Sequence, residues 1–295
     1  MKKTTMFRNL LKSNEVISIP GTYNALIAKL IEQKGFKAIY CTGGGISTSI
    51  YGLPDIGLVT LTEMVYIIKQ ISDSVEIPVI SDADTGYGDA TNVSRTIKEF
   101  EKIGVAGVHL EDQMFPKKCG HVKGKKLIST EEMVGKIRAA VGARTDPDFV
   151  IIARTDSRAI EGMDRAVKRS KEYIKAGADI IFPEALKTKD EFAQFASNFS
   201  GFPLLANMTE FGQSPYLTVN ELKEIGYKIV IFPATTQRVE MKVLSEFLED
   251  LKRDGTQKEW VEKMQPRKEL YELIKYSNYI EKQKEFISDG GVEPI

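Results

Sequence analysis

The chain has few cysteines, no excess of charge of one sign and no long apolar run. Its two cysteines among 295 residues, Cys41 and Cys119, are too few for a disulfide framework and are expected to be reduced thiols. Basic and acidic side chains number 41 each, which excludes the basic surface that nucleic acid or an anionic membrane requires. No segment approaches the ~20 apolar residues of a membrane span, and no apolar core of signal-peptide length follows Met1-Lys2-Lys3. We therefore expect a soluble, cytoplasmic protein with no nucleic-acid or membrane partner.

Short apolar runs that alternate with helical patterns make up most of the chain. The runs are Val16–Pro20, Ala38–Cys41, Pro78–Ser81, Gly107–Leu110, Phe149–Ala153, Ile180–Phe182, Leu204–Ala206 and Lys228–Phe232. The helical patterns are Asn24–Lys34, Leu61–Ser72, Asn92–Ile103, Ser129–Val141, Met163–Ala176, Lys189–Phe199 and Val219–Ile225. Near-continuous apolar strands between helices indicate an α/β fold with a parallel sheet. Eight such strands favour a closed (β/α)₈ TIM-type barrel, and an open doubly wound sheet is the alternative.

Capping residues support several of these helices. Ser129 with Glu132, and Thr218 with Glu221, have the spacing of a capping box, which satisfies free amides at a helix start. Gly177 follows a helical pattern at the position where a left-handed residue ends a helix.

Polar residues gather where the apolar runs end. They are Thr42-Gly43-Gly44-Gly45, Asp82 and Asp84, Glu111-Asp112, Arg154 and Asp156, Glu184, Asn207 and Thr209, and Arg238. Barrel enzymes build their active sites at the carboxyl ends of the strands, from residues of several strands. The pattern therefore predicts one polar site at that end of the barrel.

The chain is longer than the ~250 residues that a barrel of this kind needs. We expect residues 1–255 to form the barrel and residues 256–295 to form a C-terminal helical extension. Thr256–Phe286 has a helical pattern interrupted at Pro266 and is rich in aromatic side chains. Such a helix needs an apolar surface to cover, either on a neighbouring subunit or on its own barrel.

Asp82 and Asp84 are candidate metal ligands. Their spacing at a strand end places both carboxylates on one face, where they repel unless a cation or a proton lies between them. Hard oxygen ligands with open positions suit Mg²⁺, which keeps several waters. A helix cap or a structural salt bridge is the alternative for this pair.

Cationic and amide groups near the same strand ends predict a site for an anion. Arg154 and Arg238 each follow an apolar run, and a guanidinium binds a carboxylate in bidentate fashion. Gly43-Gly44-Gly45 allows backbone amides to approach an anion, although it lacks the spacing of a Walker or dinucleotide-binding loop. Ion pairing of the arginines with Asp156 or Glu240, and a plain turn at the glycines, are the alternatives.

The segment Lys117-Lys118-Cys119-Gly120-His121 is the strongest candidate for chemistry. Two ammonium groups and an imidazole beside a thiol are expected to lower the pKa of Cys119 from its free value of about 8.5. The glycines predict a mobile loop over the site. Cys41 lies in an apolar run and is expected to be buried, as is a hydrogen-bonded His109.

Several motifs together resemble the isocitrate lyase and phosphoenolpyruvate mutase superfamily, over about Phe7 to Tyr279. They are Gly52-Leu53-Pro54-Asp55, Asp82–Gly88, Gly107–Gln113, Lys117–His121, Ala153–Asp156 and Asn207–Gly212. The short length is similar to that of the 2-methylisocitrate lyases within it. The resemblance implies a carbon–carbon lyase that cleaves 2-methylisocitrate to pyruvate and succinate in propionate degradation by the methylcitrate cycle.

The resemblance also implies a ligand set and an assembly. Mg²⁺ would be bound through Asp82 and Asp84, with Glu111 in its outer shell. Substrate-binding positions of the family fall on Thr42, Gly43, Gly44, Cys119, Gly120, Arg154, Glu184, Asn207, Met208, Thr209, Arg238 and Arg267. The family forms homotetramers that exchange a C-terminal helix between barrels, which implies the same role for the C-terminal extension here.

Two positions imply which substrate is bound. In the resembling enzymes a Phe and an aliphatic residue accommodate the substrate methyl group, and Phe182 and Ile231 fall on those positions. Lys118, in contrast, stands where many 2-methylisocitrate lyases have Arg and isocitrate lyases have Lys. Phe182 and Ile231 would touch the methyl group directly, so we expect 2-methylisocitrate. An isocitrate lyase-like enzyme, or one acting on phosphonopyruvate or oxaloacetate, is the alternative.

A lyase of this kind needs an acid and a base. We expect Cys119 to donate a proton to the carbanion-like product, with His121 and the two lysines stabilising the thiolate. Tyr40, at a strand end, is the expected base. A carboxylate-binding barrel without activity and a redox-sensing thiol protein are the remaining alternatives, and the latter would require Cys41 to reach Cys119.

Overall fold

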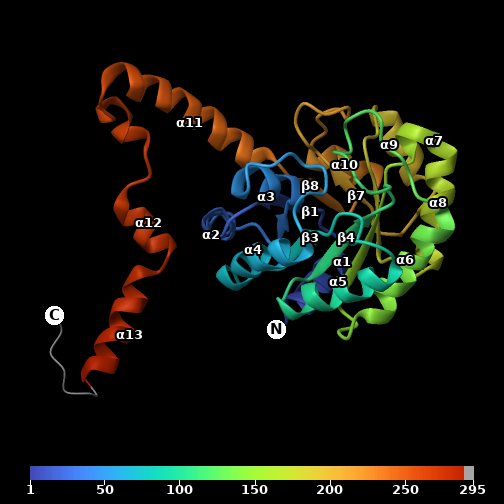
Figure 1. Cartoon of the computed structure of the whole chain (residues 1–295), viewed down its shortest axis with the longest axis horizontal. Helices are drawn as coiled ribbons and strands as arrows, with labels where there is room; N and C mark the ends of the chain where they lie inside the picture. Colours follow the sequence, from blue (N-terminus) through green and yellow to red (C-terminus); the bar gives the residue numbers. More distant parts are fainter. Residues whose placement is uncertain (289–295) are drawn as a thin grey trace. The chain divides into compact units, whose positions relative to one another are not determined.

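The computed structural model describes residues 1–288, and its first compact unit, residues 1–238, is a barrel of eight parallel strands (Figure 1). The strands are β1 (Ile17–Thr22), β2 (Ile39–Cys41), β3 (Val79–Asp82), β4 (Gly107–Glu111), β5 (Val150–Thr155), β6 (Ile180–Pro183), β7 (Leu205–Asn207) and β8 (Ile229–Phe232). Neighbours in the sequence pair in parallel register, β1 pairs with β8, and a bridge from Ile181 to Leu204 joins β6 to the start of β7. The predicted (β/α)₈ barrel is confirmed, and all eight predicted strands are present.

Helices surround the strands of this unit (Figure 1). They are α1 (Lys3–Lys12), α2 (Ala25–Gln33), α3 (Gly43–Ile50), α4 (Leu61–Ser74), α5 (Ala90–Lys102), α6 (Thr130–Ala143), α7 (Arg158–Glu161), α8 (Met163–Lys175), α9 (Lys189–Ala196) and α10 (Val219–Ile225). Thr218 and Glu221 form the predicted capping box, and Gly177 has the predicted positive φ of 106°. Ser129 caps α6 by accepting from the Glu132 amide, but the return bond of a capping box is not formed.

Helix α1 was not predicted, and it closes the amino-terminal end of the barrel. Phe7 is fully buried and belongs to the same apolar cluster as Ile17, Ile152 and Ile229 of the strands. Thr5 donates to Asp148 at 2.6 Å, and this bond ties α1 to the segment before β5. The open end of the barrel is therefore the carboxyl-terminal one.

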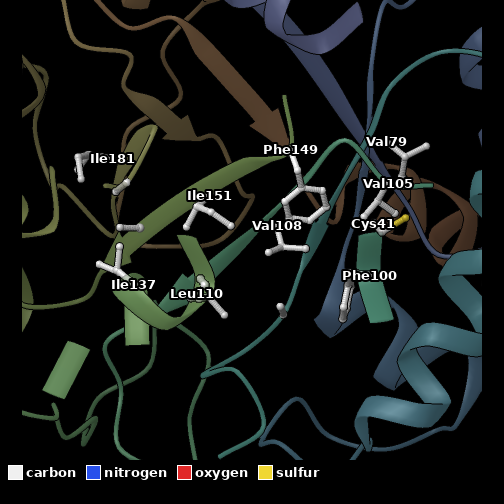
Figure 2. Close-up of a cluster of buried hydrophobic side chains, with 14 of the residues drawn as sticks. Cys41, Val79, Phe100, Val105, Val108, Leu110, Ile137, Phe149, Ile151 and Ile181 are labelled. Atoms are coloured by element: carbon white, nitrogen blue, oxygen red, sulfur yellow. The ribbon is translucent and has the colours of Figure 1, made fainter. Parts of the chain in front are cut away.

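The alternation of side chains along each strand separates two apolar layers. Val108 and Ile151 point outward and pack with Phe100 of α5 and Ile137 of α6 in the layer between strands and helices (Figure 2). Residues at the alternate positions, such as Ile152, fill the barrel interior. Because side chains alternate with a period of two, the same strands aim their last polar residues inward, toward the barrel mouth.

The second compact unit begins at residue 239, and its described part, residues 239–288, is helical; the rest of the predicted extension lies outside the described residues. It contains most of α11 (Thr235–Asp254), then the 3₁₀ helix η1 (Lys258–Lys263), α12 (Arg267–Leu273) and α13 (Tyr276–Ser288). Pro266 is the N-cap of α12, at the interruption that the sequence predicted. Trp260 donates to Asp250 at 2.9 Å and packs edge-on against Phe247, which ties η1 to α11. Within residues 1–288, none of these or the other helices is both long and apolar enough to cross a bilayer.

Candidate active site

A polar cavity of about 220 Å³ opens at the carboxyl ends of the strands. It is lined by Tyr40, Thr42, Gly44, Gly45, Thr48, Asp55, Asp82, Lys117, Lys118, Cys119, Gly120, His121, Arg154, Phe182, Glu184, Asn207, Thr209, Ile231, Pro233, Ala234, Gln237 and Arg238. The larger depression beside α8, about 630 Å³, is lined by outer helical residues such as Lys168 and Lys175 and lies away from the strand ends. The cavity at the barrel mouth thus gathers most of the predicted site residues, contributed by seven strands or the loops that follow them.

Carboxylates from two loops meet around the ammonium group of Lys117. Its Nζ lies 2.8 Å from Oδ1 of Asp84 and also contacts Asp55. The Asp84 amide donates to Oδ1 of Asp82 at 2.9 Å, so these two aspartates belong to one turn. A Cβ at position 43 would lie 2.5 Å from Oδ2 of Asp82, so only glycine lets α3 start this close to the carboxylate.

The negative charge of the buried carboxylates in this cluster is not fully balanced by positive side chains. Burial, opposed by Lys117, raises the pKa of Asp84 to about 6. Burial also raises the pKa of Asp82, against the effect of Lys117, and raises that of Glu111 against the effect of Arg154. Such shifts mean that one ammonium group does not fully compensate the carboxylates.

The donor set fits a hard divalent cation. In the part of the chain that the structure describes, no group of three or more His, Cys, Asp and Glu side chains is arranged to enclose a metal. A cation that keeps several waters needs only one or two carboxylates, which Asp82 and Asp84 supply. Oε1 of Glu111 is buried without a hydrogen-bond partner, as expected for a group that accepts from such waters.

Arg154 is buried among acids at the centre of the cavity. Its guanidinium lies 3.2 Å from Glu111, 3.0 Å from Asp156 and 3.6 Å from Glu184. It also lies over the ring of Phe182, with 5.3 Å from Cζ to the ring centroid. These contacts orient the guanidinium rigidly, and they include the Asp156 pairing that was the structural alternative for this residue.

Arg238 differs from Arg154 because its side chain is 44% exposed. It pairs with Glu210 at 3.4 Å and lies over the ring of Phe211, 5.2 Å from the centroid. The partner is therefore Glu210 and not Glu240, which was the alternative considered from the sequence. A half-exposed guanidinium at the cavity rim remains free to turn toward an anion.

The loop that carries Cys119 is held over the cavity by polar contacts. Gln113 donates to the Lys118 carbonyl at 2.8 Å and accepts from the Lys118 amide at 2.9 Å. Lys125 contacts the Gly120 carbonyl and lies 2.7 Å from Asp156. In this arrangement Lys117 to His121 face the strand ends.

The predicted pKa of Cys119 was wrong in direction. Desolvation raises the pKa of its thiol, an effect to which the carboxylates of Asp55 and Glu184 add. The reason is that Lys117 is neutralised by Asp55 and Asp84 and does not act on the sulfur. Cys119 is a free cysteine with an exposed side chain. Cys41 is buried as predicted, and desolvation raises its pKa as well.

His121 reaches the floor of the cavity. Its Nε2 lies 2.7 Å from Oε1 of Glu184. Asn207 donates to the same carboxylate at 3.2 Å. Burial opposes ionisation, but Arg154 and His121 hold the pKa of Glu184 well below its ordinary range, so this carboxylate is charged.

Tyr40 does not have the properties expected of a base. Burial, followed by the Asp82 carboxylate, raises the pKa of Tyr40 well above its ordinary value, so the phenol keeps its proton at neutral pH. Its hydroxyl lies 2.8 Å from Nε2 of His109. Burial lowers the pKa of His109 to about 3, and this neutral, buried histidine confirms the structural role expected of it. Tyr40 is therefore placed as a hydrogen-bond donor.

The triple glycine is not a loop. Gly43-Gly44-Gly45 forms the first turn of α3, and Thr42 caps it by accepting from the Gly45 amide at 3.2 Å. The amino end of this helix points its first amides into the cavity, where a carboxylate would meet them. A helix terminus, and not a loop, therefore stands where the sequence predicted an anion contact.

The remaining predicted residues are divided between the cavity and other places. Phe182 and Ile231 are buried and line the cavity as an apolar wall, beside Thr209 and Gly120. Met208 is buried in the outer apolar layer and does not line the cavity. Its side chain points away because it alternates with that of Asn207 along the chain. Arg267 is exposed at the start of α12 in the second unit.

Sequence reasoning missed what several site residues do. Lys117 was taken as a neighbour of the thiol, but its partners are the carboxylates. Lys125 and Asp156 hold the loop and the arginine, respectively, and no spacing links them along the chain. Asp55, Lys117 and Asp156 lie in motifs of the resemblance, whereas Lys125 lies in none of them.

Comparison with known proteins bears on the identity of this site. A family model described as phosphoenolpyruvate phosphomutase matches residues 7–252. The chain is 49% identical to the 2-methylisocitrate lyase of Aeropyrum pernix over 280 residues, 95% of this chain and 90% of the relative. It is 44% identical to the 2-methylisocitrate lyase of Escherichia coli, over 94% of this chain and 93% of that one.

Solved structures agree with these relatives. A crystal structure of 2,3-dimethylmalate lyase superposes with a TM-score of 0.91 at 36% identity, covering 100% of this chain and 99% of that one. Phosphonopyruvate hydrolase in complex with oxalate and Mg²⁺ superposes with a TM-score of 0.85 at 31% identity, covering 98% and 99%.

Proposed function

The chain belongs to the phosphoenolpyruvate phosphomutase family, and we propose that within this family it is a carbon–carbon lyase that cleaves 2-methylisocitrate to pyruvate and succinate. Curated 2-methylisocitrate lyases at 44–49% identity over most of the chain support this activity. The observation that carries the substrate assignment is the apolar wall of Phe182 and Ile231 beside the arginine, which offers a methyl group a dry surface next to a carboxylate site.

The cavity offers separate positions for several carboxylates. Arg154 is fixed by its acidic neighbours and presents its guanidinium from the floor, while Arg238 is free to turn in from the rim. The amides at the start of α3 supply a third position, next to the capping residue Thr42. Three anion positions suit a tricarboxylate better than a monocarboxylate.

We propose that Asp82 and Asp84 hold Mg²⁺, with Glu111 accepting from its waters. When bound, the cation supplies Lewis-acid polarisation and orientation of the substrate oxygens. Two observations support this assignment. Phosphonopyruvate hydrolase was crystallised with Mg²⁺, and the buried carboxylates here, such as Asp84, are not fully balanced by positive charge. Lys117, which lies between Asp55 and Asp84, balances the remaining negative charge.

The reaction breaks the bond between the carbinol carbon and the neighbouring CH of the substrate. The hydroxyl gives its proton, through water, to a carboxylate beside the metal site, for which we propose Glu111, whose Oε1 is buried without a hydrogen-bond partner. The hydroxyl oxygen then becomes the keto oxygen of pyruvate, while the electron pair of the broken bond moves to the CH carbon beside its carboxylate. Cys119 donates the proton that completes succinate, and its raised pKa keeps the thiol protonated until then. Lys118 and the main-chain amide of His121 stabilise the thiolate that remains, and Tyr40 donates a hydrogen bond to the substrate oxygen.

The second unit supports a proposal about assembly. Helix α11 has no buried residue, and eleven large apolar side chains of residues 239–286 are 40–75% exposed, among them Leu248, Tyr279 and Phe286. An apolar helical surface of this extent needs a partner in water. We propose that α11 and the described part of the C-terminal extension, residues 256–288, pack on a second copy of the chain in a homotetramer, in which Arg267 would contribute to substrate binding. We also propose that the protein is cytoplasmic.

A substrate panel tests the proposed function. The protein, with Mg²⁺, is incubated separately with 2-methylisocitrate, isocitrate, 2,3-dimethylmalate, phosphonopyruvate and oxaloacetate, and the keto products are followed. We expect pyruvate from 2-methylisocitrate with a kcat/KM at least about tenfold above that for isocitrate, the discrimination that one methyl group provides. Glyoxylate from isocitrate at equal efficiency, or faster turnover of 2,3-dimethylmalate, would overturn the substrate assignment.

A further inference from the structure

Two loops from opposite sides of the barrel mouth meet at His121. One is the loop between β4 and α6 that carries Cys119, and the other is the segment between β7 and α10 that carries Gly212 and Gln213. Neither Gly212 nor Gln213 lines the cavity, and neither is among the residues to which the proposed function assigns a role. Their contacts nevertheless determine how the imidazole is held.

The main-chain amide of Gln213 fixes the tautomer of His121. It donates to Nδ1 of the imidazole at 2.9 Å. An amide N–H only donates, so Nδ1 must carry a lone pair, and the proton of the neutral ring must lie on Nε2. An imidazolium also carries a proton on Nδ1, so its N–H would face the N–H of the Gln213 amide and no hydrogen bond would form. The contact therefore selects a neutral ring whose Nε2–H faces the charged Glu184, 2.7 Å away.

The side chain of Gln213 binds the main chain of His121. Its Nε2 donates to the His121 carbonyl at 2.9 Å. The amide of His121, on the other side of that residue, hydrogen-bonds the Cys119 sulfur. Gln213 thus hydrogen-bonds both the ring and the backbone of His121, and His121 in turn orients the thiol of Cys119.

Gly212 leaves the space in which the His121 ring accepts the hydrogen bond from Gln213. A Cβ at this position would lie 2.6 Å from Nδ1 of His121 and 2.9 Å from Cγ, well inside van der Waals contact. The backbone of Gly212 is not left-handed, so alanine is allowed there when the ring is absent. Alanine at position 212 is therefore compatible with an open loop and incompatible with the closed one.

We propose that Gly212 and Gln213 form a clasp that closes the Cys119 loop and holds His121 as the Nε2–H tautomer. They act as positioning residues for the proton donor, and in that respect the proposal rests on the proposed lyase activity. The clasp itself is a property of the closed loop and is measurable without turnover.

The tautomer is tested by ¹⁵N NMR of the full chain labelled at histidine. The chain has only two histidines, so a His121→Asn variant assigns both sets of signals. At pH 7.5 we expect wild-type His121 to be neutral with its proton on Nε2, and Gly212→Ala to shift it toward a mixture of tautomers. An imidazolium or an Nδ1–H tautomer in the wild-type protein would overturn the proposal.

Loop closure is tested by limited trypsin digestion, since Lys118, Lys123 and Lys126 are exposed in the loop. We expect Gly212→Ala and Gln213→Met each to speed cleavage of this loop by about fivefold or more, the population change that loss of one hydrogen bond produces. Gly135→Ala, where a Cβ meets nothing within 4 Å, and the exposed Gln194→Met are matched controls and should match the wild-type protein. Equal cleavage in all five proteins would overturn the proposal.

Turnover of 2-methylisocitrate separates this proposal from the proposed function. We expect Gly212→Ala to lower kcat by about 100-fold, as a displacement of ~1 Å in a catalytic group does, and Gln213→Met to lower it by about fivefold, with smaller changes in KM. Normal turnover by both variants would overturn the clasp and leave the lyase assignment intact. No turnover by the wild-type protein, with the expected tautomer and protection, would overturn the lyase assignment and leave the clasp. If Gly212→Ala fails to fold, Gln213→Met alone decides.

Discussion

Nζ of Lys125 lies 2.7 Å from Oδ1 of Asp156, and both side chains are almost completely buried. Asp156 also binds the guanidinium of Arg154 at 3.0 Å, and its own amide donates to Asp112 at 2.9 Å. A lysine of the Cys119 loop and an arginine of the barrel floor therefore share one carboxylate. Loop position and arginine orientation are coupled through Asp156.

Lys125→Met is expected to lower stability and substrate affinity together. Removing one partner of a buried ion pair leaves the other poorly compensated, which costs roughly 3 kcal/mol. We expect a lower Tm by differential scanning calorimetry and a higher KM, because the loop loses its anchor and Arg154 shifts toward Asp156. Lys126→Met, at an exposed neighbour, is the matched control.

A second substitution shows whether the pair is the cause. In Lys125→Met with Asp156→Asn, the loss of Tm should be smaller than the sum of the two single losses, since the uncompensated charge is gone. Additive losses would mean that the two residues act independently.

Cys119→Ser is expected to keep the fold and to lose most turnover. A hydroxyl is a far weaker acid than a thiol, so the carbanion-like intermediate is not protonated efficiently. Circular dichroism and the Mg²⁺-induced rise in Tm should match those of the wild-type protein, while kcat falls. Near-normal kcat in this variant would remove Cys119 from the mechanism.

The raised pKa of the Cys119 thiol predicts slow alkylation. Only the thiolate reacts with iodoacetamide, so at pH 7 the rate should lie below that of free cysteine and rise about tenfold per pH unit toward the thiol pKa. Mass spectrometry locates the adduct, and Cys41 should stay unmodified because it is buried. Alkylation faster than free cysteine at pH 7 would restore the lowered pKa that the sequence suggested.

Mg²⁺ is expected to stabilise the protein through Asp84. A ligand that binds only the folded state raises the free energy of unfolding by about 2.7 kcal/mol at 100 times its Kd, and a thermal-shift assay detects the resulting rise in Tm. Asp84→Asn should reduce this shift and turnover, whereas Asp89→Asn, in the N-cap of α5 and outside the carboxylate cluster, should reduce neither. A full Mg²⁺ shift in Asp84→Asn would contradict the ligand assignment.

Glu221 is expected to make stability depend on pH. The hydrogen bonds of its carboxylate with Thr218 and Lys189 lower its pKa from 4.5 to about 2 in the folded protein. A lowered pKa stabilises the fold above about pH 4.5, and the stabilisation is lost as the pH falls toward 2. Glu221→Gln should therefore lower Tm at pH 7, with a difference that shrinks below pH 4.5. Glu224→Gln, one turn further along α10, should give no such difference.

The fold was predictable from the sequence because its determinants are local. Strands such as Gly107–Glu111 are apolar runs, helices such as α10 begin at caps, and polar residues end the strands. Helix α1 was not predicted, because what stabilises it is the burial of Phe7 in the distant barrel end. The triple glycine showed no helical pattern, since its helix starts where Gly43 must fit against Asp82.

The sequence by itself determined the barrel, the family and the residue types that converge at its mouth. Each of these follows from periodicity, capping and motifs along the chain. Only the tertiary structure decided how the charges pair. It placed Lys117 among the aspartates and not beside the thiol, and it brought Gln213 to His121 across 92 positions. The electrostatic effect of a charged group depends on its distance in space and on its burial, and sequence spacing gives neither.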